Sequence, residues 1–169
     1  MKFYLSLLIP AFLLPTFLKA QTTYTSTVDN QKVVILNGII TKYALENNQA
    51  FTWYKANQNG YTPDTAVVNA LAGAKDAYRF VIFGGTWCGD TQFILPKFFK
   101  LQEMAGFSDS NISFFAVNRA KQTIGNITAA FNITNVPTII VMKNGLEVGR
   151  VVEYGKTGHW DRELIPLLK

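Results

Sequence analysis

A single cysteine, Cys88, is the residue of this sequence best suited to chemistry. It lies in the run Trp87-Cys88-Gly89-Asp90-Thr91, between an apolar stretch that predicts a buried strand and a stretch that predicts a helix. A thiol at the start of a helix faces unpaired backbone N–H groups and the positive end of the helix dipole, which together stabilise a thiolate. This position predicts a nucleophile. The alternative is a small core residue, because free cysteines are often buried.

The neighbours of Cys88 each have two interpretations. The Thr91 hydroxyl is placed to donate a hydrogen bond to a Cys88 thiolate. The negative charge of Asp90 disfavours a nearby thiolate, although an acidic residue also suits the first turn of a helix and then acts only as a cap. Trp87 is either a partly exposed flank of a substrate groove or a core aromatic. The glycines at 84–85 are interpreted as turn formers.

The elements that position these residues are predicted from residue 79 onward, where apolar strands alternate with amphipathic helices. Asn144-Gly145 predicts a hairpin turn between the last two strands. This order indicates an α/β domain with a mixed central sheet that has helices on both faces. The predicted strands cover 80–83, 112–117, 138–142 and 146–152, and the predicted helices cover 88–104, 124–131 and 159–168.

The segment before residue 79 has a weaker pattern. Residues 21–30 are polar and predict a loose arm, residues 33–36 predict a short strand, and residues 38–46 form an amphipathic stretch. The aromatic cluster at 51–54 is expected to continue a helix. A turn over 57–64 leads into another helix that Asp64 or Thr65 caps. We interpret residues 21–78 as a helical N-terminal extension that also supplies the first strand.

Three fragments together resemble the thioredoxin family. The first is the apolar strand that runs into Thr86-Trp87-Cys88-Gly89, and the second is Pro96, eight residues after the cysteine. The third is Val136-Pro137-Thr138, which leads into an apolar run that ends at Lys143-Asn144-Gly145. The resemblance covers about residues 79–169 and implies a thioredoxin-like fold.

The resemblance implies a site as well as a fold. In thioredoxin-like proteins the proline that matches Pro137 is cis and lies against the active-site cysteine, which leaves the Val136 backbone free to pair with an extended substrate segment. Cys88 and Thr91 are then the expected catalytic positions. Pro96 removes one helical hydrogen bond, to the carbonyl of Gln92, so a kink is expected there. The expected substrate-binding residues are Trp87, Gly89, Asp90, Val136 and Pro137.

Two positions depart from the family pattern. The family's redox motif is Cys-x-x-Cys, but Thr91 stands at the second position and the chain has no other cysteine. A mixed disulfide on Cys88 therefore needs an external thiol for release. The family also often has a buried acid six residues before the nucleophile, where this chain has Ile82.

Residues 1–20 have the pattern of a secretory signal peptide. Lys2 precedes an apolar run from Phe3 to Phe17, and Ala20 is a small residue at the expected cleavage point. The alternative is an uncleaved anchor, but the run is short for a bilayer and two prolines interrupt it. We expect an exported, periplasmic or secreted protein with one domain over 21–169, its core over 79–169, and no stable membrane anchor after leader removal.

Composition narrows the function classes. The chain has 169 residues, 49% of them apolar, with one Cys and one His, which excludes internal disulfides and Cys/His metal sites. Without Lys2 and Lys19, 14 basic residues stand against 11 acidic ones, with no basic cluster, so no nucleic-acid partner is expected. His159 lacks a motif that would make it a partner of Cys88, and no metal or cofactor is expected.

Two functions remain after these exclusions. The first is thiol–disulfide exchange, in which Cys88 attacks a protein disulfide or mixed disulfide and an external thiol reductant completes turnover. The alternative is a redox-inactive binding or chaperone-like module that keeps the groove around Trp87, Val136 and Pro137.

Overall fold

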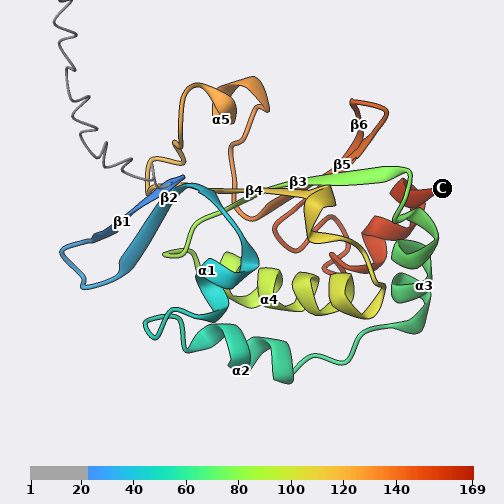
Figure 1. Ribbon diagram of the computed structural model, residues 1–169, viewed down its shortest axis with the longest axis horizontal. Coiled ribbons are helices and arrows are strands. Elements are labelled where there is room, and N and C mark those ends of the chain that lie inside the picture. Colours follow the sequence, from blue (N-terminus) through green and yellow to red (C-terminus); the bar gives the residue numbers. More distant parts are fainter. Residues whose placement is uncertain (1–22) are drawn as a thin grey trace, which may run out of the picture.

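The computed structural model describes residues 23–169, and its strands form one six-stranded mixed sheet (Figure 1). The spatial order is β1-β2-β4-β3-β5-β6, in which β3 and β4 are parallel and the other neighbours are antiparallel. The predicted leader, residues 1–20, lies outside the described residues. The strands are β1 (Tyr24–Val28), β2 (Val34–Ile40), β3 (Tyr78–Gly84), β4 (Ile112–Ala116), β5 (Thr138–Lys143) and β6 (Leu146–Val152).

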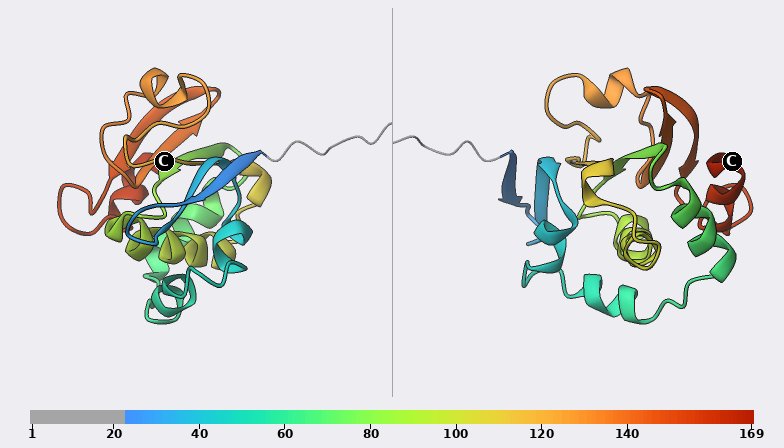
Figure 2. Two further views of the ribbon diagram at one scale, coloured as in Figure 1. Left: turned by 90° about the vertical axis from the view of Figure 1, so that its left-hand side faces the viewer. Right: turned by 45° about the vertical axis from the view of Figure 1, so that its right-hand side comes forward.

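Helices cover both faces of this sheet, as the sequence predicts. The α-helices are α1 (Lys42–Glu46), α2 (Trp53–Asn59), α3 (Thr65–Ala74), α4 (Gly89–Met104) and α5 (Ile127–Ala130), and the 3₁₀ helices are η1 (Asp109–Asn111) and η2 (Arg162–Leu168). Figures 1 and 2 show α5 on the opposite side of the sheet from α4. The prediction of a mixed central sheet with helices on both faces is therefore confirmed.

Strand β3 separates two hydrophobic clusters because successive side chains of a strand point to opposite faces. Phe80 and Ile82 belong to the larger cluster, which also contains buried residues of α3, α4 and η2. Phe83 points to the other face, where it packs with Ile140 and with residues in and beside α5. Two-sided burial explains why β3 is a nearly continuous apolar run.

The N-terminal segment differs from its prediction in one respect. Residues 24–28 form β1, an edge strand that pairs along its whole length with β2, whereas the sequence predicts a loose arm there. The prediction is wrong because all of β1 after Tyr24 is exposed, so its sequence carries no apolar alternation and only backbone pairing forms the strand. Strand β2 also extends to Ile40, beyond the predicted 33–36.

Two later elements are smaller or different from those predicted. Helix α5 covers only Ile127–Ala130, and Gly125 before it has a positive φ of 55°. The closing element begins at Arg162 and is a 3₁₀ helix rather than an α-helix from 159. Pro166 lies inside it and has no N–H to donate to the carbonyl four residues earlier, which disfavours the α-helical pattern.

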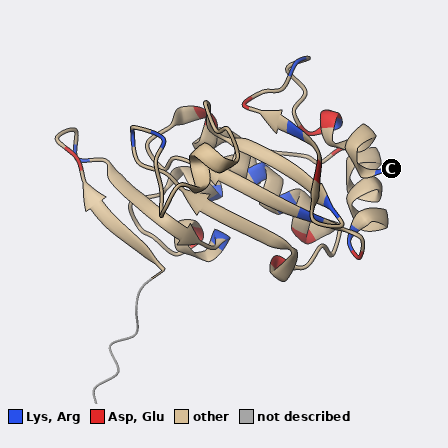
Figure 3. Cartoon of the chain, turned by 90° about the horizontal axis from the view of Figure 1, so that it is seen from above, with Lys and Arg blue, Asp and Glu red and all other residues tan. Residues whose placement is uncertain are grey.

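Figure 3 shows basic and acidic residues mixed over the described chain.

Candidate thiol site at the start of helix α4

The loop between β3 and α4 holds Cys88 at the N-cap position of α4. The Cys88 N–H donates to the Gly85 carbonyl at 2.9 Å, and the Cys88 carbonyl accepts from the Gln92 N–H at 3.0 Å. The Gln92 side chain also donates to the Thr86 carbonyl at 2.8 Å. These bonds connect the loop to the first helical turn and fix the position of Cys88.

Cys88 and Val136 are in direct contact, as the resemblance implies. The half-buried Cys88 thiol donates to the Val136 carbonyl at 3.1 Å, and the Val136–Pro137 peptide bond is cis. Both Val136 and Pro137 are buried. The structure therefore brings together Cys88, the predicted nucleophile, and the proline loop from segments 48 residues apart.

Thr91 has a different partner from the one expected. Its side chain is buried, and its hydroxyl accepts from the Gly85 N–H at 3.2 Å. Within residues 23–169 no hydrogen bond joins Thr91 to Cys88. Thr91 therefore supports the backbone of the loop in this structure, and its predicted bond to a Cys88 thiolate stays a prediction.

Trp87 is half-buried and combines features of both of its interpretations. Its indole Nε1–H donates to the Val117 carbonyl at 3.0 Å, and the side chain packs against the cluster that contains Phe83. The Arg119 guanidinium lies over the indole ring, 5.5 Å from the ring centroid. Trp87 is thus fixed beside Cys88 by a backbone acceptor and a cation.

The two glycines of the loop have packing roles beyond turn formation. A Cβ at Gly85 would lie 2.7 Å from the Trp87 indole, and a Cβ at Gly84 would lie 2.8 Å from Leu95. Any larger residue at 85 would displace Trp87 from its place over the backbone. Gly89, the next glycine, is exposed and has open space around it.

Tyr154 is a neighbour of the site that the sequence analysis does not identify. The Glu153 N–H donates to the Pro137 carbonyl at 2.8 Å, which holds the segment after β6 against the proline loop. The Tyr154 ring lies 5.8 Å from the Phe93 ring, one helical turn beyond Asp90. Burial raises the pKa of the Tyr154 phenol. The adjacent Asp90 carboxylate raises it further, because its negative charge repels the phenolate and because it accepts a hydrogen bond from the phenol. No local motif marks Tyr154, because only the pairing of β6 with β5 brings it here.

The other predicted positions have simpler surroundings. Asp90 lies in the first turn of α4, where a carboxylate favours the helix. Ile82, at the family's acid position, is fully buried in the larger cluster. His159 is exposed. Among residues 23–169, no three acidic, His or Cys side chains gather as metal ligands would, and none of the helices is long and apolar enough to span a bilayer.

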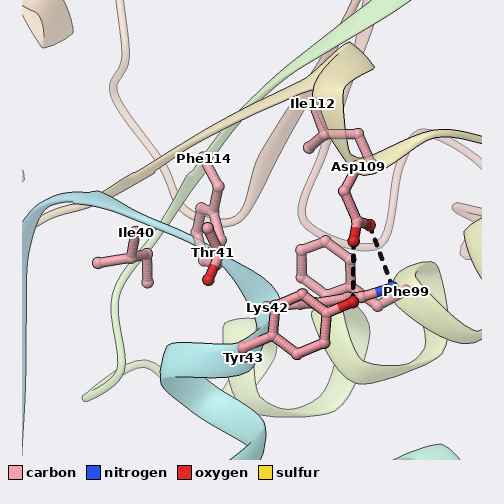
Figure 4. A pocket seen from close by; sticks show the side chains of 8 residues that line it. All are labelled: Ile40, Thr41, Lys42, Tyr43, Phe99, Asp109, Ile112 and Phe114. Carbon is pink, nitrogen blue, oxygen red and sulfur yellow. Dashed lines mark hydrogen bonds and ion pairs between the residues drawn. The ribbon is translucent and has the colours of Figure 1, made fainter.

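A separate pocket of about 50 Å³ lies between β2, α4 and β4, and it contains none of the predicted site residues (Figure 4). The buried Lys42 ammonium there contacts Gln102 at 2.9 Å, Glu103 at 2.9 Å and Asp109 at 3.1 Å. Burial disfavours the charged form of Lys42 and lowers its pKa. The hydrogen bonds and negative charges of Glu103 and Asp109 have a larger effect in the opposite direction, so the pKa of Lys42 is raised. Because an ammonium has three donors, Lys42 has none left for a ligand. The cluster therefore joins α1 to α4 and η1.

Comparison with known proteins agrees with this geometry. The family model for thioredoxin matches residues 64–161. A Mycoplasma genitalium thioredoxin is 39% identical over 74 residues, which are 44% of this chain and 67% of that protein. An Echinococcus granulosus thioredoxin is 35% identical over 49% of this chain and 70% of its own length. A thioredoxin-like protein of Acanthamoeba polyphaga mimivirus is 29% identical over 53% of this chain and 62% of its own length. The chain thus spans about two thirds of these relatives.

Proposed function

Because this chain belongs to the thioredoxin family, we propose that it carries out thiol–disulfide exchange through Cys88 alone. The observation that carries the proposal is the position of Cys88 at the N-cap of α4, beside the cis Val136–Pro137 peptide bond. Free N–H groups at a helix start favour a thiolate, which is the attacking species in exchange.

The proposed reaction consists of two successive thiol–disulfide exchanges. The Cys88 thiolate attacks one sulfur of a protein disulfide, forms a new S–S bond with it, and expels the other sulfur as a thiolate that takes a proton from water. A second, external thiolate then attacks the substrate sulfur of this mixed disulfide. Cys88 leaves with the electron pair, and the substrate sulfur becomes disulfide-bonded to the external thiol. Full reduction of the substrate requires another external thiol.

The single cysteine is the reason for the external thiol. The family pattern has a second cysteine at position 91, where this chain has the buried Thr91. Its hydroxyl cannot replace a thiolate in the attack on a mixed disulfide. The partners we propose are a protein with a disulfide or mixed disulfide and a thiol reductant. We further propose that this reaction takes place outside the cytoplasm, since residues 1–20 have the pattern of an export signal.

The decisive experiment follows covalent adducts on Cys88 by intact mass. The protein and its Cys88→Ser variant are incubated with insulin as a disulfide substrate, and glutathione is then added. We expect an adduct on the parent that the added thiol releases, and none on Cys88→Ser. Ser suits an N-cap position, so circular dichroism should show an unchanged fold. Equal release of thiols from insulin by both proteins would overturn the proposal.

A second variant tests the resolving position. Residues three apart at a helix start have Cα atoms about 5 Å apart, within the range of about 4.4 to 6.8 Å for disulfides. Thr91→Cys should therefore form an internal disulfide and, with dithiothreitol, reduce insulin faster than the parent. Thr91→Ser keeps the acceptor for the Gly85 N–H and is the matched control, expected to behave as the parent.

The second candidate function is a redox-inactive binding module. The observation that favours it is the burial of both Thr91 and Pro137, together with the contact that the Cys88 thiol already makes with Val136. If Thr91→Cys forms its disulfide but reduces nothing, and the parent forms no adduct with insulin, the binding module becomes the better description.

A further inference from the structure

The N-terminal hairpin of β1 and β2 lies outside the matched family region, yet it contacts the thiol site loop. The buried Thr86 hydroxyl donates to the Val34 carbonyl at 2.8 Å and accepts from the Leu36 N–H at 3.2 Å. Both partners belong to β2. The hairpin is therefore bonded to the residue that stands two positions before Cys88.

A second contact starts in the turn of this hairpin. One carboxylate oxygen of Asp29, Oδ1, accepts from the N–H groups of Gln31 and Val33, both at 2.9 Å. The other oxygen, Oδ2, accepts from Arg119 Nε at 2.8 Å and Nη2 at 2.5 Å. The two functions of Asp29 thus use different oxygens: one closes the turn and the other holds Arg119.

Arg119 connects this carboxylate to the site. It follows β4, and its guanidinium also donates to the Gln31 side chain at 3.0 Å. The group lies 5.5 Å from the centroid of the Trp87 ring, while the indole N–H is held by Val117. A cation beside an indole face is attracted by the ring's electrons. Because a guanidinium is a rigid plane, fixing it on Asp29 also fixes the surface that it presents to Trp87.

We propose that Asp29 and Arg119 are a positioning pair for Trp87, through which the N-terminal hairpin sets the shape of the wall beside Cys88. The pair acts on the indole and not on the sulfur. Its effect on substrate rests on the proposed exchange function, whereas its effect on the indole does not. The hairpin is then part of the site and not only an added edge of the sheet.

The first test measures hydrogen exchange of the indole N–H groups by NMR. The chain has three tryptophans, and the Trp87 signal is assigned by its loss in Trp87→Phe. Asp29→Asn keeps a side-chain oxygen for the turn and replaces Oδ2 with an amide that cannot accept from Arg119. We expect exchange at Trp87 to become about two- to fivefold faster, the range that corresponds to a partly exposed ion pair. The Trp53 and Trp160 signals should not change, which distinguishes positioning from general loss of stability.

The structure offers a matched control in Asp64. One of its oxygens caps α3 by accepting from the Ala66 N–H at 2.8 Å, and the other pairs with Arg162 at 2.9 Å. Asp64→Asn therefore removes the same kind of contact at a different place. We expect no change at the Trp87 indole in this variant. Unchanged exchange at Trp87 in Asp29→Asn, or an equal change in Asp64→Asn, would overturn the positioning pair.

The second test measures how fast Cys88 forms its adduct with insulin. The Asp29→Asn variant should react about two- to fivefold more slowly than the parent and than Asp64→Asn. Faster indole exchange with an unchanged adduct rate would overturn the claim that the pair shapes the substrate wall. If the parent itself forms no adduct, the exchange function fails, while indole exchange still decides whether Asp29 and Arg119 position Trp87.

Discussion

At the scale of single residues, the thiol loop is held by side-chain oxygens that serve the backbone. The hydroxyl of Thr91 accepts a hydrogen bond from the Gly85 N–H. The hydroxyl of Thr86 bridges two peptide groups of β2, because it donates to one carbonyl and accepts from one N–H. A buried backbone group without a partner costs free energy, so each hydroxyl prevents such a loss. This explains why polar residues that do not touch the Cys88 sulfur are buried beside it.

The bridging role of Thr86 leads to a prediction about stability. Thr86→Val keeps the shape of the side chain but leaves the Val34 carbonyl and the Leu36 N–H without that partner. We expect a loss of about 2 kcal/mol in the free energy of unfolding. Thr86→Ser keeps the hydroxyl and should lose clearly less. Urea denaturation of the three proteins measures the difference, and equal stability of the Val and Ser variants would contradict the bridge.

Lys97 allows a prediction about pH. It is buried in α4 beside the Phe93 and Tyr61 rings, and burial lowers the pKa of its ammonium below 10.5 despite the opposing charge of Asp161. The folded protein therefore loses this proton at a lower pH than the unfolded chain. The cost of burying the charge is complete below the lowered pKa and is relieved as pH rises from there toward 10.5.

We therefore expect the stability of the parent relative to Lys97→Met to rise with pH across that window. Urea denaturation of both proteins between pH 7 and pH 10.5 provides the measurement, because titration of the other groups is common to the two proteins and cancels. Lys100→Met is the comparison variant: Lys100 lies in the same helix but donates to the Gln58 and Tyr61 carbonyls. A stability difference that stays constant with pH would contradict the prediction for Lys97.

At the scale of elements, α4 shows how the fold compensates for a proline. Pro96 lies inside the helix and cannot donate to the Gln92 carbonyl. That carbonyl accepts instead from the Asn57 side chain of α2 at 3.1 Å. The same side-chain nitrogen donates to the Trp53 carbonyl at 3.0 Å. Helix α2, from the N-terminal extension, thus replaces a hydrogen bond that the thioredoxin-like core lacks.

Asn57→Ala tests this compensation. The variant leaves the Gln92 carbonyl without its partner, and we expect a loss of about 1 kcal/mol in the free energy of unfolding. Asn59→Ala is the control, since Asn59 is an exposed residue of the same helix and likewise gains helix propensity on replacement by alanine. Guanidinium denaturation gives both values. A loss in the control that matches the loss in Asn57→Ala would contradict the proposed role of the bond.

The elements that the sequence predicts well are those with a strong local signal, which is an apolar run, a capping residue or a turn pair. The apolar run of β3, the Asp64 cap of α3 and the Asn144-Gly145 hairpin are all confirmed. The contact of Cys88 with the Val136-Pro137 loop followed from ordered family motifs rather than from periodicity. Strand β1 was not predicted, because its pairing with β2 depends on backbone bonds that leave no apolar pattern.

The remaining site residues could not be found from local sequence. Arg119 reaches Asp29 across 90 positions, and Asn57 reaches Gln92 across 35. Such pairs arise from the packing of whole elements, and neither partner belongs to a motif. Tyr154 is similar, because it is placed beside Asp90 only when β6 pairs with β5. A single sequence predicts the position of Cys88 at the start of α4 and its contact with the proline loop, but not the side chains that support them.

At the scale of the whole molecule, the N-terminal hairpin is an integral part of the sheet (Figure 2). Strand β2 pairs with β4 over Gly38–Ile40, and β1 covers the outer edge of β2. Gly38 has a φ of 126°, and a Cβ there would lie 2.5 Å from the Thr23 carbonyl oxygen, which itself accepts from Ile39. The sheet therefore uses the chain from Thr23 onward.

This boundary leads to a prediction about export. Cleavage after Ala20, which we propose, leaves Thr23 and the rest of the sheet in the mature chain. The protein recovered from the periplasm of a bacterial host should therefore begin at Gln21 and retain the full stability of a chain that is expressed from Gln21 without the leader. Intact mass and urea denaturation measure the two properties.

Ala20→Leu replaces the small residue that the cleavage site requires and should leave the leader attached. Recovery of the parent protein in the membrane fraction with residues 1–20 still present would instead support the anchor alternative.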